Sequence, residues 1–180
     1  MYLALIIGPM FSGKTKKMIE FIRLKKREGK KSIIISHASD IRYAKEKIAS
    51  HDGQLEPCIS LYDLLPVLDT QVFSETDSVF IEEAQFFDDL LPFVLRCVAC
   101  KKNVYVAGLQ SDYMMQPFSN IISLISLADN IIHLRAKCMY DGCFQDASFS
   151  KCIDFSGCRD NNIGGIEKYM AVCRSHFLKE

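Results

Sequence analysis

At 180 residues, the chain is long enough for one α/β core with a small appendage and short for two full domains. Hydrophobic residues make up 49% of it and charged residues 24%, an ordinary globular composition that excludes a disordered chain. Lysine plus arginine and aspartate plus glutamate each number 22, so the formal net charge is zero. Stable nucleic-acid binding needs an excess of cations, and this balance argues against it.

The N-terminal segment predicts a strand, a turn and a helix. Tyr2 to Ile7 is a near-continuous apolar run, as expected of a strand covered on both faces. It lacks the basic preface and cleavage site of a signal peptide, and no stretch is long enough to span a bilayer. We therefore expect a cytoplasmic protein without a membrane partner, whose eight cysteines stay reduced. Residues 15–27 show helical apolar spacing, which Gly29 ends.

The turn between this strand and helix carries the strongest motif. It reads Gly8-Pro9-Met10-Phe11-Ser12-Gly13-Lys14-Thr15 and fits the phosphate-binding pattern G-x-x-x-x-G-K-[ST] in full. In such a loop the backbone N–H groups surround the phosphates, the lysine reaches the β- and γ-phosphates, and the threonine hydroxyl meets Mg²⁺. Its place between a strand and a helix is the context that the motif requires, so we predict that residues 8–15 bind a nucleoside triphosphate.

Two further strands are expected at 32–36 and 78–81, separated by a region that is polar from His37 to about Gln54. The second of them runs into two adjacent carboxylates, Glu82 and Glu83. In a P-loop protein, a carboxylate at the end of a buried strand completes the magnesium shell, and its neighbour can face the acceptor substrate as a base. The alternative is a strand that runs into a helix whose first turn favours acidic residues.

The alternation continues with a helix at 90–100, a strand at 103–107, a helix at 117–128 opened by Pro117, and a strand at 131–134. Strands that alternate with helices predict an α/β fold: a P-loop NTPase-like parallel sheet with helices on both faces and ligand sites at the carboxyl ends of the strands. We expect this ATP-binding and phosphoryl-transfer domain to span residues 1–136.

From residue 137 the pattern stops, and the segment 137–180, which holds five of the eight cysteines, predicts a small zinc-containing domain. Cys138-x4-Cys143 and Cys173-x2-His176 are two ligand pairs separated by a longer loop, which is typical of a structural zinc that clamps two segments. Cys152 and Cys158 are rival ligands, and unliganded core thiols are the other alternative. Cys97 and Cys100 lie in an apolar helix and are predicted to be core packing.

Several motifs together resemble the thymidine kinases shared by animal cytosol, bacteria and large DNA viruses. The resemblance covers nearly the whole chain. It rests on the loop at 8–15, Asp40-x-Arg42-Tyr43, His51-Asp52, Glu83-x-Gln85-Phe86-Phe87, Ala107-Gly108-Leu109, Pro117-Phe118, Cys143-Phe144 and Gly164-Gly165-x-x-Lys168-Tyr169. Methionine and phenylalanine inside the loop, with the late Gly-Gly-x-x-Lys-Tyr before a cysteine, are more specific than the loop itself. The compact chain and its unusual tail hint at a large DNA virus as the source.

The resemblance implies roles at the matching positions. Glu83 would be the general base toward the 5′-hydroxyl of thymidine, and Arg42 and Lys14 would stabilise the transferring phosphoryl group. Lys14, Thr15 and Glu82 would hold ATP and Mg²⁺, with Asp40 and Gln85 in the same cofactor site. The thymine would lie in an apolar slot under a loop called the lasso, which runs from about Phe144 to Val172. The expected slot residues are Met10, Phe86, Leu109, Tyr113, Phe118, Ser150 and Tyr169.

The family further implies formation of dTMP in pyrimidine deoxynucleotide salvage, a homotetramer, and feedback inhibition by dTTP. This sequence departs from the family at Glu82, where aspartate is common, and at Gln110, Tyr113, His176 and the longer Cys138–Cys143 gap. These departures bear on metal geometry and base selectivity. The alternative function is a zinc-containing, nucleic-acid-dependent P-loop ATPase, which we would expect to be larger and more basic.

Overall fold

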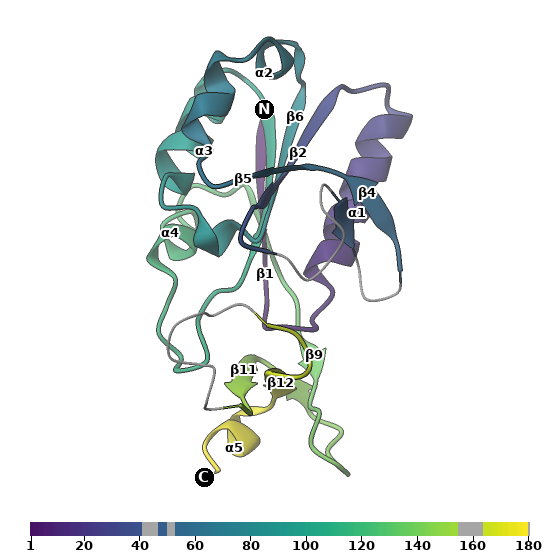
Figure 1. Cartoon of the computed structure of the whole chain (residues 1–180), viewed down its shortest axis with the longest axis vertical. Helices are drawn as coiled ribbons and strands as arrows, with labels where there is room; N and C mark the ends of the chain where they lie inside the picture. The colour runs from purple at the N-terminus through teal and green to yellow at the C-terminus, as the bar shows by residue number, and fades with distance from the viewer. Residues whose placement is uncertain (41–46, 50–52, 155–163, 180) are drawn as a thin grey trace.

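A computed structural model, which describes residues 1–40, 47–49, 53–154 and 164–179, centres on one six-stranded sheet (Figure 1). Its strand order is β5-β2-β6-β7-β1-β8, and every pairing is parallel. The predicted parallel α/β fold is therefore confirmed. The strands are β1 (Tyr2–Ile7), β2 (Ser32–His37), β5 (Ile59–Leu61), β6 (Ser78–Glu82), β7 (Asn103–Gly108) and β8 (Asn130–His133).

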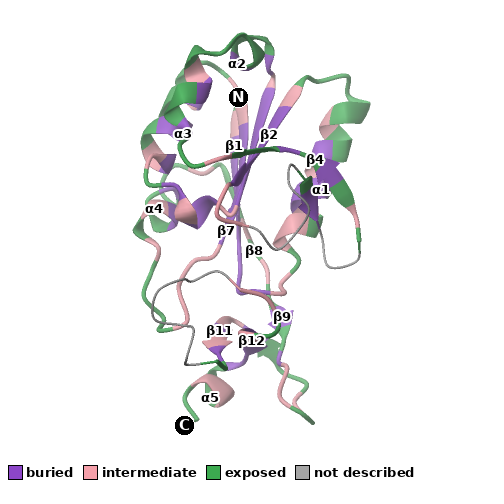
Figure 2. Ribbon diagram, in the orientation of Figure 1, coloured by how far each residue is buried: buried purple, intermediate pink, exposed green. Residues whose placement is uncertain are grey.

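The three central strands β6, β7 and β1 are nearly continuous apolar runs because helices cover both faces of the sheet (Figure 2). Side chains alternate between these faces. Along β1, Ala4 and Ile6 pack with one buried cluster, and Leu3, Leu5 and Ile7 pack with another. This period of two lets one short strand contribute to both halves of the core.

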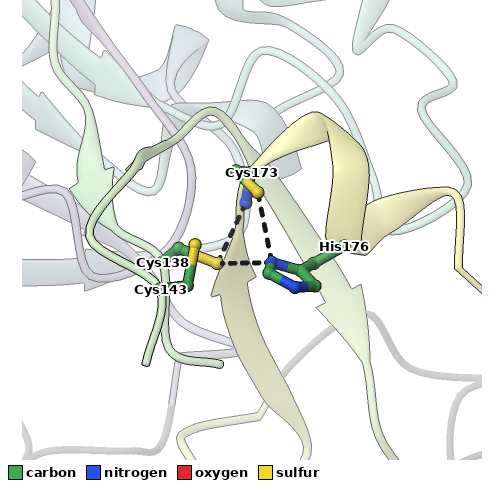
Figure 3. Close-up of side chains that lie close together, drawn as sticks. All are labelled: Cys138, Cys143, Cys173 and His176. Atoms are coloured by element: carbon green, nitrogen blue, oxygen red, sulfur yellow. Dashed lines mark hydrogen bonds between the residues drawn. The ribbon is translucent and has the colours of Figure 1, made fainter. Parts of the chain in front are cut away.

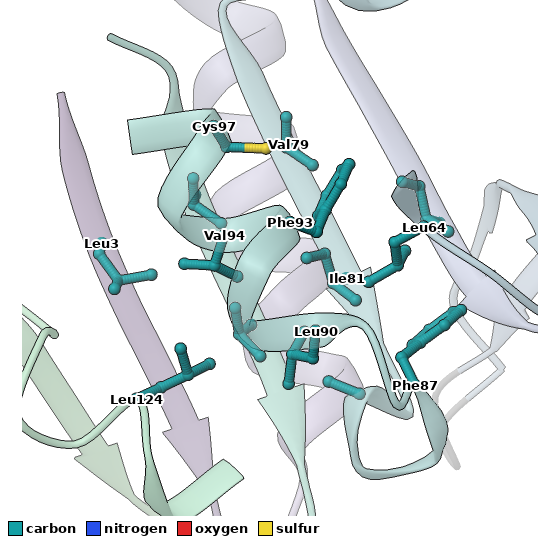
Figure 4. Close-up of a cluster of buried hydrophobic side chains, with 14 of the residues drawn as sticks. Leu3, Leu64, Val79, Ile81, Phe87, Leu90, Phe93, Val94, Cys97 and Leu124 are labelled. Atoms are coloured by element: carbon teal, nitrogen blue, oxygen red, sulfur yellow. The ribbon is translucent and has the colours of Figure 1, made fainter. Parts of the chain in front are cut away.

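Helix α1 (Lys14–Arg27) covers the first face, where it buries Met18, Ile19 and Ile22. The second face is covered by η1 (Leu65–Asp69), α2 (Gln71–Glu75), α3 (Leu90–Ala99) and α4 (Ser119–Ile122). Figure 4 shows side chains of α3, among them Leu90, Phe93 and Val94, packed over β6 and β1. Burial of one such side chain stabilises the fold by about 1.5–3 kcal/mol, so this larger cluster dominates the core.

The expected helix over 117–128 is wrong in extent, because only Ser119–Ile122 is α-helical. Phe118 is extended (φ −76°, ψ 101°), and its N–H donates to the Gln110 carbonyl at 3.1 Å. Pro117 forms a bridge with Ser111, so it pairs with a neighbouring segment and does not open the helix. After Ile122 the backbone continues in i→i+3 turns, such as Leu127 N–H to the Leu124 carbonyl at 3.1 Å.

The polar stretch after β2 also contains short strands that its sequence pattern did not predict. β3 (Lys47–Ala49) and β4 (Leu55–Pro57) form an antiparallel pair beside α1. Glu56 of β4 is buried and forms ion pairs with Arg23 and Lys26 of α1. A strand of three residues is too short to show hydrophobic periodicity, and the edge strand β5, which also has three residues, was missed for the same reason.

The C-terminal segment lies at the carboxyl end of β1 (Figure 1). It contains β9 (Ala136–Lys137), β10 (Asp146–Ala147), β11 (Phe149–Cys152), β12 (Tyr169–Val172) and α5 (Arg174–Phe177). The pairs β9–β10 and β11–β12 are both antiparallel. Across the described ranges, no helix has the length and apolar character that crossing a membrane requires.

Candidate active site and metal centre

The phosphate-loop motif forms the turn between β1 and α1. Gly13 has φ +85°, a left-handed conformation that favours glycine. At Gly8 the restriction is space, since a Cβ there would lie 2.6 Å from both the Leu134 carbonyl oxygen and Ser12 Oγ. Ser12 Oγ is buried and has no hydrogen-bond partner within the described residues. A tight backbone turn with an unsatisfied buried hydroxyl fits a phosphate group.

The structure brings together two of the predicted site residues, Thr15 and Glu82, at the end of this loop, and Lys14 lies across its turn. Lys14 Nζ donates to the carbonyls of Gly8 and Pro9 at 3.1 and 2.8 Å, so the ammonium lies across the turn. Thr15 Oγ1 donates to Glu82 Oε1, and Glu82 is only 4% exposed at the carboxyl end of β6. A hydroxyl and a carboxylate are oxygen donors of the kind that Mg²⁺ takes, so the pair fits a magnesium–triphosphate site.

Glu83 follows directly and has a left-handed backbone, with φ +52° and ψ +40°. A non-glycine residue in this region costs about 1–3 kcal/mol and persists only where its surroundings hold it there. The Gln85 side chain is part of those surroundings: its Nε2 donates to Glu83 Oε2 at 2.6 Å, and its Oε1 accepts from the Leu109 N–H at 3.1 Å. The assignment of Gln85 to the cofactor site stays a prediction.

A small cavity lies between the sheet and the C-terminal segment, with about 240 Å³ of space including its open mouth. Six of the seven predicted slot residues line it, and Ser111 and Asp112 line it without having been predicted. Phe86 is not among the lining residues; its ring lies 5.6 Å from that of His37. The lining residues are Met10, Leu109, Ser111, Asp112, Tyr113, Phe118, Ser150 and Tyr169.

Two polar groups, the hydroxyls of Ser150 and Tyr169, set the polarity of this cavity. Ser150 Oγ of β11 accepts from the buried Met10 N–H at 3.0 Å, so the phosphate loop and the C-terminal segment share a hydrogen bond. The Tyr169 hydroxyl is buried and has no hydrogen-bond partner among the described residues. Burial, together with the nearby Tyr113 and Asp112, raises the pKa of Tyr169. The cavity therefore presents a neutral hydroxyl on an apolar wall, which suits a small ligand with a polar edge.

His37 is a residue near the site that the sequence did not single out. It ends β2, is 7% exposed, and packs against Tyr62, Phe86 and Phe87. Burial lowers the pKa of His37 against the opposing effect of nearby carboxylates, and its Nδ1 accepts from the Ser39 N–H at 3.3 Å. Its only sequence signal was its place directly after a strand.

Other predicted positions on this side are only partly described. Asp40 is half-buried in the turn after β2, where its N–H donates to the His37 carbonyl at 3.0 Å. Arg42, Tyr43, His51 and Asp52 lie outside the described residues. The role expected of Arg42 therefore stays a prediction.

The C-terminal segment brings together the predicted metal ligands (Figure 3). The ligand atoms of Cys138, Cys143, Cys173 and His176 all lie within 4.8 Å of one another. His176 Nδ1 lies 3.4 Å from Cys138 Sγ and 3.2 Å from Cys173 Sγ. Three thiols and one imidazole at this spacing fit a tetrahedral zinc site.

The environment of Cys138 favours its thiolate form. Burial opposes ionisation, but backbone hydrogen bonds from Cys173 and Tyr140 and side-chain hydrogen bonds from His176 and Cys143 lower the pKa of Cys138 to about 6. The Tyr140 ring stacks on the His176 imidazole, with centroids 4.3 Å apart, and so fixes the ring plane.

The other described cysteines are not part of this cluster. Cys152 packs with Met10 and Tyr169 and is disulfide-bonded, so the expectation that all eight cysteines stay reduced is wrong for this residue. Cys158 lies outside the described residues. Cys97 is buried core packing, as predicted, and burial raises its pKa to about 12. Cys100 is exposed, so the core-packing prediction is wrong for that residue. The reason is that Cys100 follows the last residue of α3 and lies beyond its buried face.

Comparison with known proteins agrees with this geometry. The family model described as thymidine kinase matches residues 1–177. The chain is 34% identical over 177 residues to thymidine kinase a of Arabidopsis thaliana, which covers 96% of this chain and 73% of that protein. It is 36% identical over 175 residues to the thymidine kinase of Myxoma virus (strain Uriarra), and that match covers 97% of this chain and 94% of the viral protein. It is 35% identical over 179 residues to the thymidine kinase of Sheeppox virus (strain KS-1), and that match covers 99% of this chain and 98% of the viral protein.

A family match over nearly the full length, with relatives at these identities, establishes that the chain belongs to the thymidine kinase family.

Proposed function

We propose that this thymidine kinase transfers the γ-phosphoryl group of ATP to the 5′-hydroxyl of thymidine, giving dTMP for pyrimidine deoxynucleotide salvage. The observation that carries the proposal is convergence: the phosphate loop, the Glu82–Glu83 pair and the cavity all lie at the carboxyl ends of the parallel strands β1, β6 and β7. This edge is where α/β sheets bind ligands.

On the nucleotide side, the N–H groups of the loop and the Lys14 ammonium would bind the phosphates of ATP. Thr15 and Glu82, already joined by a hydrogen bond, are the residues that would hold Mg²⁺. When bound, Mg²⁺ neutralises charge on the phosphate oxygens. Asp40 and Arg42 are assigned to the same phosphoryl-transfer site on the family resemblance.

On the acceptor side, Glu83 would take the proton from the 5′-hydroxyl as that oxygen attacks the γ-phosphorus. The cavity would hold the thymine ring between Met10, Leu109 and Tyr169, with Ser150 facing its edge. An apolar slot of this size excludes water from the reacting hydroxyl and leaves little room for a purine.

The metal centre would have a structural role. Cys138 and Cys143 come from the start of the C-terminal segment, and Cys173 and His176 from its end. A zinc ion held by all four would join the two ends of the loop that covers the thymine. We assign residues 1–136 to phosphoryl transfer and 137–180 to this zinc-containing lasso domain.

The remaining assignments follow from the family resemblance alone. They are a homotetramer, feedback inhibition by dTTP, and a cytoplasmic location, in a host cell if the source is viral. No observation on the described residues favours the alternative, a nucleic-acid-dependent ATPase.

The test is to incubate the purified protein with γ-labelled ATP and either thymidine or single-stranded DNA. Thymidine-dependent formation of labelled dTMP is the expected result. Release of free phosphate that DNA stimulates, without labelled dTMP, would overturn the proposal in favour of the ATPase. A panel of deoxyuridine, deoxycytidine and purine deoxynucleosides then defines the selectivity of the slot.

A further inference from the structure

We infer that Gln85 is a positioning residue, which holds the Glu83 carboxylate in place and ties it to the wall of the thymidine cavity. We further infer that Asn120 fixes the short helix η2 (Ala84–Phe86), in which Gln85 lies. The inference rests on the proposed role of Glu83 as the base. It concerns how that carboxylate is oriented, so the two ideas can fail separately.

The orientation of the Gln85 amide follows from its partners. The Leu109 N–H can only donate, so the atom that it contacts at 3.1 Å must be the Gln85 oxygen. The amide nitrogen then faces Glu83, where it donates to Oε2 at 2.6 Å. The side chain is buried, 5% exposed, which shields this charge-assisted hydrogen bond from water.

The backbone around Gln85 is held by a second amide. Asn120 Nδ2 lies 3.0 Å from the carbonyl oxygens of Gln85 and Phe87 and 3.4 Å from that of Ala84. Asn120 Oδ1 accepts from the Ile121 N–H at 2.9 Å, which fixes the direction of this amide too. One side chain of α4 therefore donates to the carbonyls of η2 and of the residue that follows it, in addition to the backbone bond from the Phe87 N–H to the Ala84 carbonyl at 3.2 Å.

Space around Gln85 is limited in a way that supports the same role. A Cβ at Gly108 would lie 2.9 Å from Gln85 Oε1 and 2.7 Å from Ile121 Cδ1. The carboxyl end of β7 thus comes close to the amide, and a side chain at position 108 would press on Gln85 and Ile121. Gly108 and Leu109 are consecutive, so the contact that fixes Gln85 comes from the strand end that leads into the cavity wall.

These contacts explain how Glu83 keeps a left-handed backbone. Strain at a single residue persists where neighbouring groups over-determine its conformation, and such residues gather at functional sites. Here the carboxylate is fixed by Gln85, the following turn by Asn120, and Gln85 itself by Leu109. The base is thereby placed relative to the slot that binds its substrate, which is what proton transfer requires.

The sharpest test is Gln85→Glu, which keeps the shape and the acceptor for the Leu109 N–H but replaces the donor to Glu83 with a second acid. Two adjacent carboxylates share a proton, so we expect kcat to fall about 10- to 100-fold and the acidic limb of the kcat–pH profile to move to higher pH. Neither of the two hydrogen bonds of the Gln85 side chain goes to the phosphate loop, so the pH profile is the measurement that reports on Glu83.

Gln71→Glu is the matched control. Gln71 Nε2 donates to Glu75 Oε1 at 2.9 Å on the exposed surface of α2, so this variant makes the same chemical change far from the site. It should leave both kcat and the pH profile unchanged. If Gln85→Glu does not fold, Asn120→Asp is the variant to use in its place. It keeps the acceptor for the Ile121 N–H and loses the donors to η2, so it should lower kcat about three- to tenfold.

A double variant separates the possible outcomes. In a Glu83→Gln background, Gln85→Glu should lower the residual turnover no further, because its effect acts through the carboxylate. An unchanged kcat and pH profile in Gln85→Glu, beside an inactive Glu83→Gln, would overturn the positioning role and leave the base in place. An equal fall in both backgrounds with no pH shift would also overturn it, as a merely structural effect. Full turnover in Glu83→Gln would instead remove Glu83 from its role.

Discussion

The two sides of the cavity that we assign to thymidine are stabilised by different means. Met10 and Leu109 lie at the ends of β1 and β7, strands that contribute to a cluster of 20 buried residues on one face of the sheet. Ser150 and Tyr169 come from the C-terminal segment, where the corresponding cluster has six such members among the described residues. A core that small rarely holds a segment by itself, and two of its six members, Cys138 and Cys173, belong to the set of candidate metal ligands. On the proposed function, we therefore expect catalysis to depend on the sheet and coverage of the substrate to depend on the metal.

Removal of a metal ligand should have the largest effect and separate the two sides. In Cys173→Ser, one of four ligands is lost, so bound zinc should fall from about one per chain to near zero. Thymidine binding should be lost while ATP binding is kept, as measured by calorimetry with each ligand. The exposed Cys100→Ser is the control and should change neither value. Zinc retained at one per chain in Cys173→Ser would show that the cluster is not the site.

Loss of the base should act on the sheet side without disturbing the other. Glu83→Gln should lower kcat about 10²- to 10⁴-fold, the usual contribution of general base catalysis. Zinc content and the affinities for ATP and thymidine should stay near their original values, which initial-rate kinetics and binding measurements would check. Glu75→Gln, an exposed change of the same type, is the matched control.

A cavity in the large core should destabilise the sheet as a whole. Phe93 is fully buried between α3 and the strands, so Phe93→Ala should lower the free energy of unfolding by about 3–5 kcal/mol. Denaturant unfolding with added zinc is the measurement, since added metal should not restore the loss. If added zinc restored the free energy of unfolding of Phe93→Ala, the stability of the sheet would also depend on the metal, which contradicts the comparison.

The hydrogen bond that joins the two sides should contribute less. Ser150→Ala leaves the buried Met10 N–H without its acceptor, at a cost of about 1–3 kcal/mol. Because Met10 belongs to the phosphate loop and Ser150 lines the cavity, the KM values for ATP and thymidine should both rise. Ser150→Thr, which keeps the hydroxyl, should behave nearly as the original chain. A rise in one KM alone would show that the bond does not couple the two ligands.

The smallest effect concerns His37 on the sheet side. Burial lowers its pKa below the ordinary value of 6.5, so the unfolded chain binds the proton more tightly than the folded one. This contribution to stability is fully present above pH 6.5 and is lost as the pH falls toward the lowered pKa. His37→Phe, which keeps an aromatic ring against Phe87, should remove that part of the pH dependence. The urea midpoint of unfolding, measured between pH 5 and 8, would check this prediction. It would be contradicted if the midpoint changed with pH to the same extent in His37→Phe and in the original chain.

Much of the sheet side could be predicted from the sequence because its signals are local. The phosphate loop is one continuous motif, and the five predicted strands agree with the structure to within one residue at every end. A buried parallel strand needs an unbroken apolar run, which a sequence shows directly. The metal ligands were predictable for a related reason, since two short spacings mark them.

The rest depended on contacts between distant segments. The Gln85 amide acts through Leu109 and Glu83, and no periodicity reports such a link. Pro117 suggested a helix start, yet pairing with Ser111 decides its conformation. Phe86 was expected in the slot on resemblance, and its ring lies against His37. In each case the partner lies elsewhere in the chain, where local propensity carries no information.

The strand order has a consequence for how the chain acquires its shape during synthesis. β1 precedes every other strand of the sheet in the chain, yet its neighbours in the sheet are β7 and β8, which begin at Asn103 and Asn130. During translation, its six largely apolar residues therefore have no partner strand until β7 has been made. Such long-range pairing is slow and leaves the apolar side chains of β1 exposed to other proteins. Newly synthesised chains should therefore depend on chaperones more than is usual for a chain of this length.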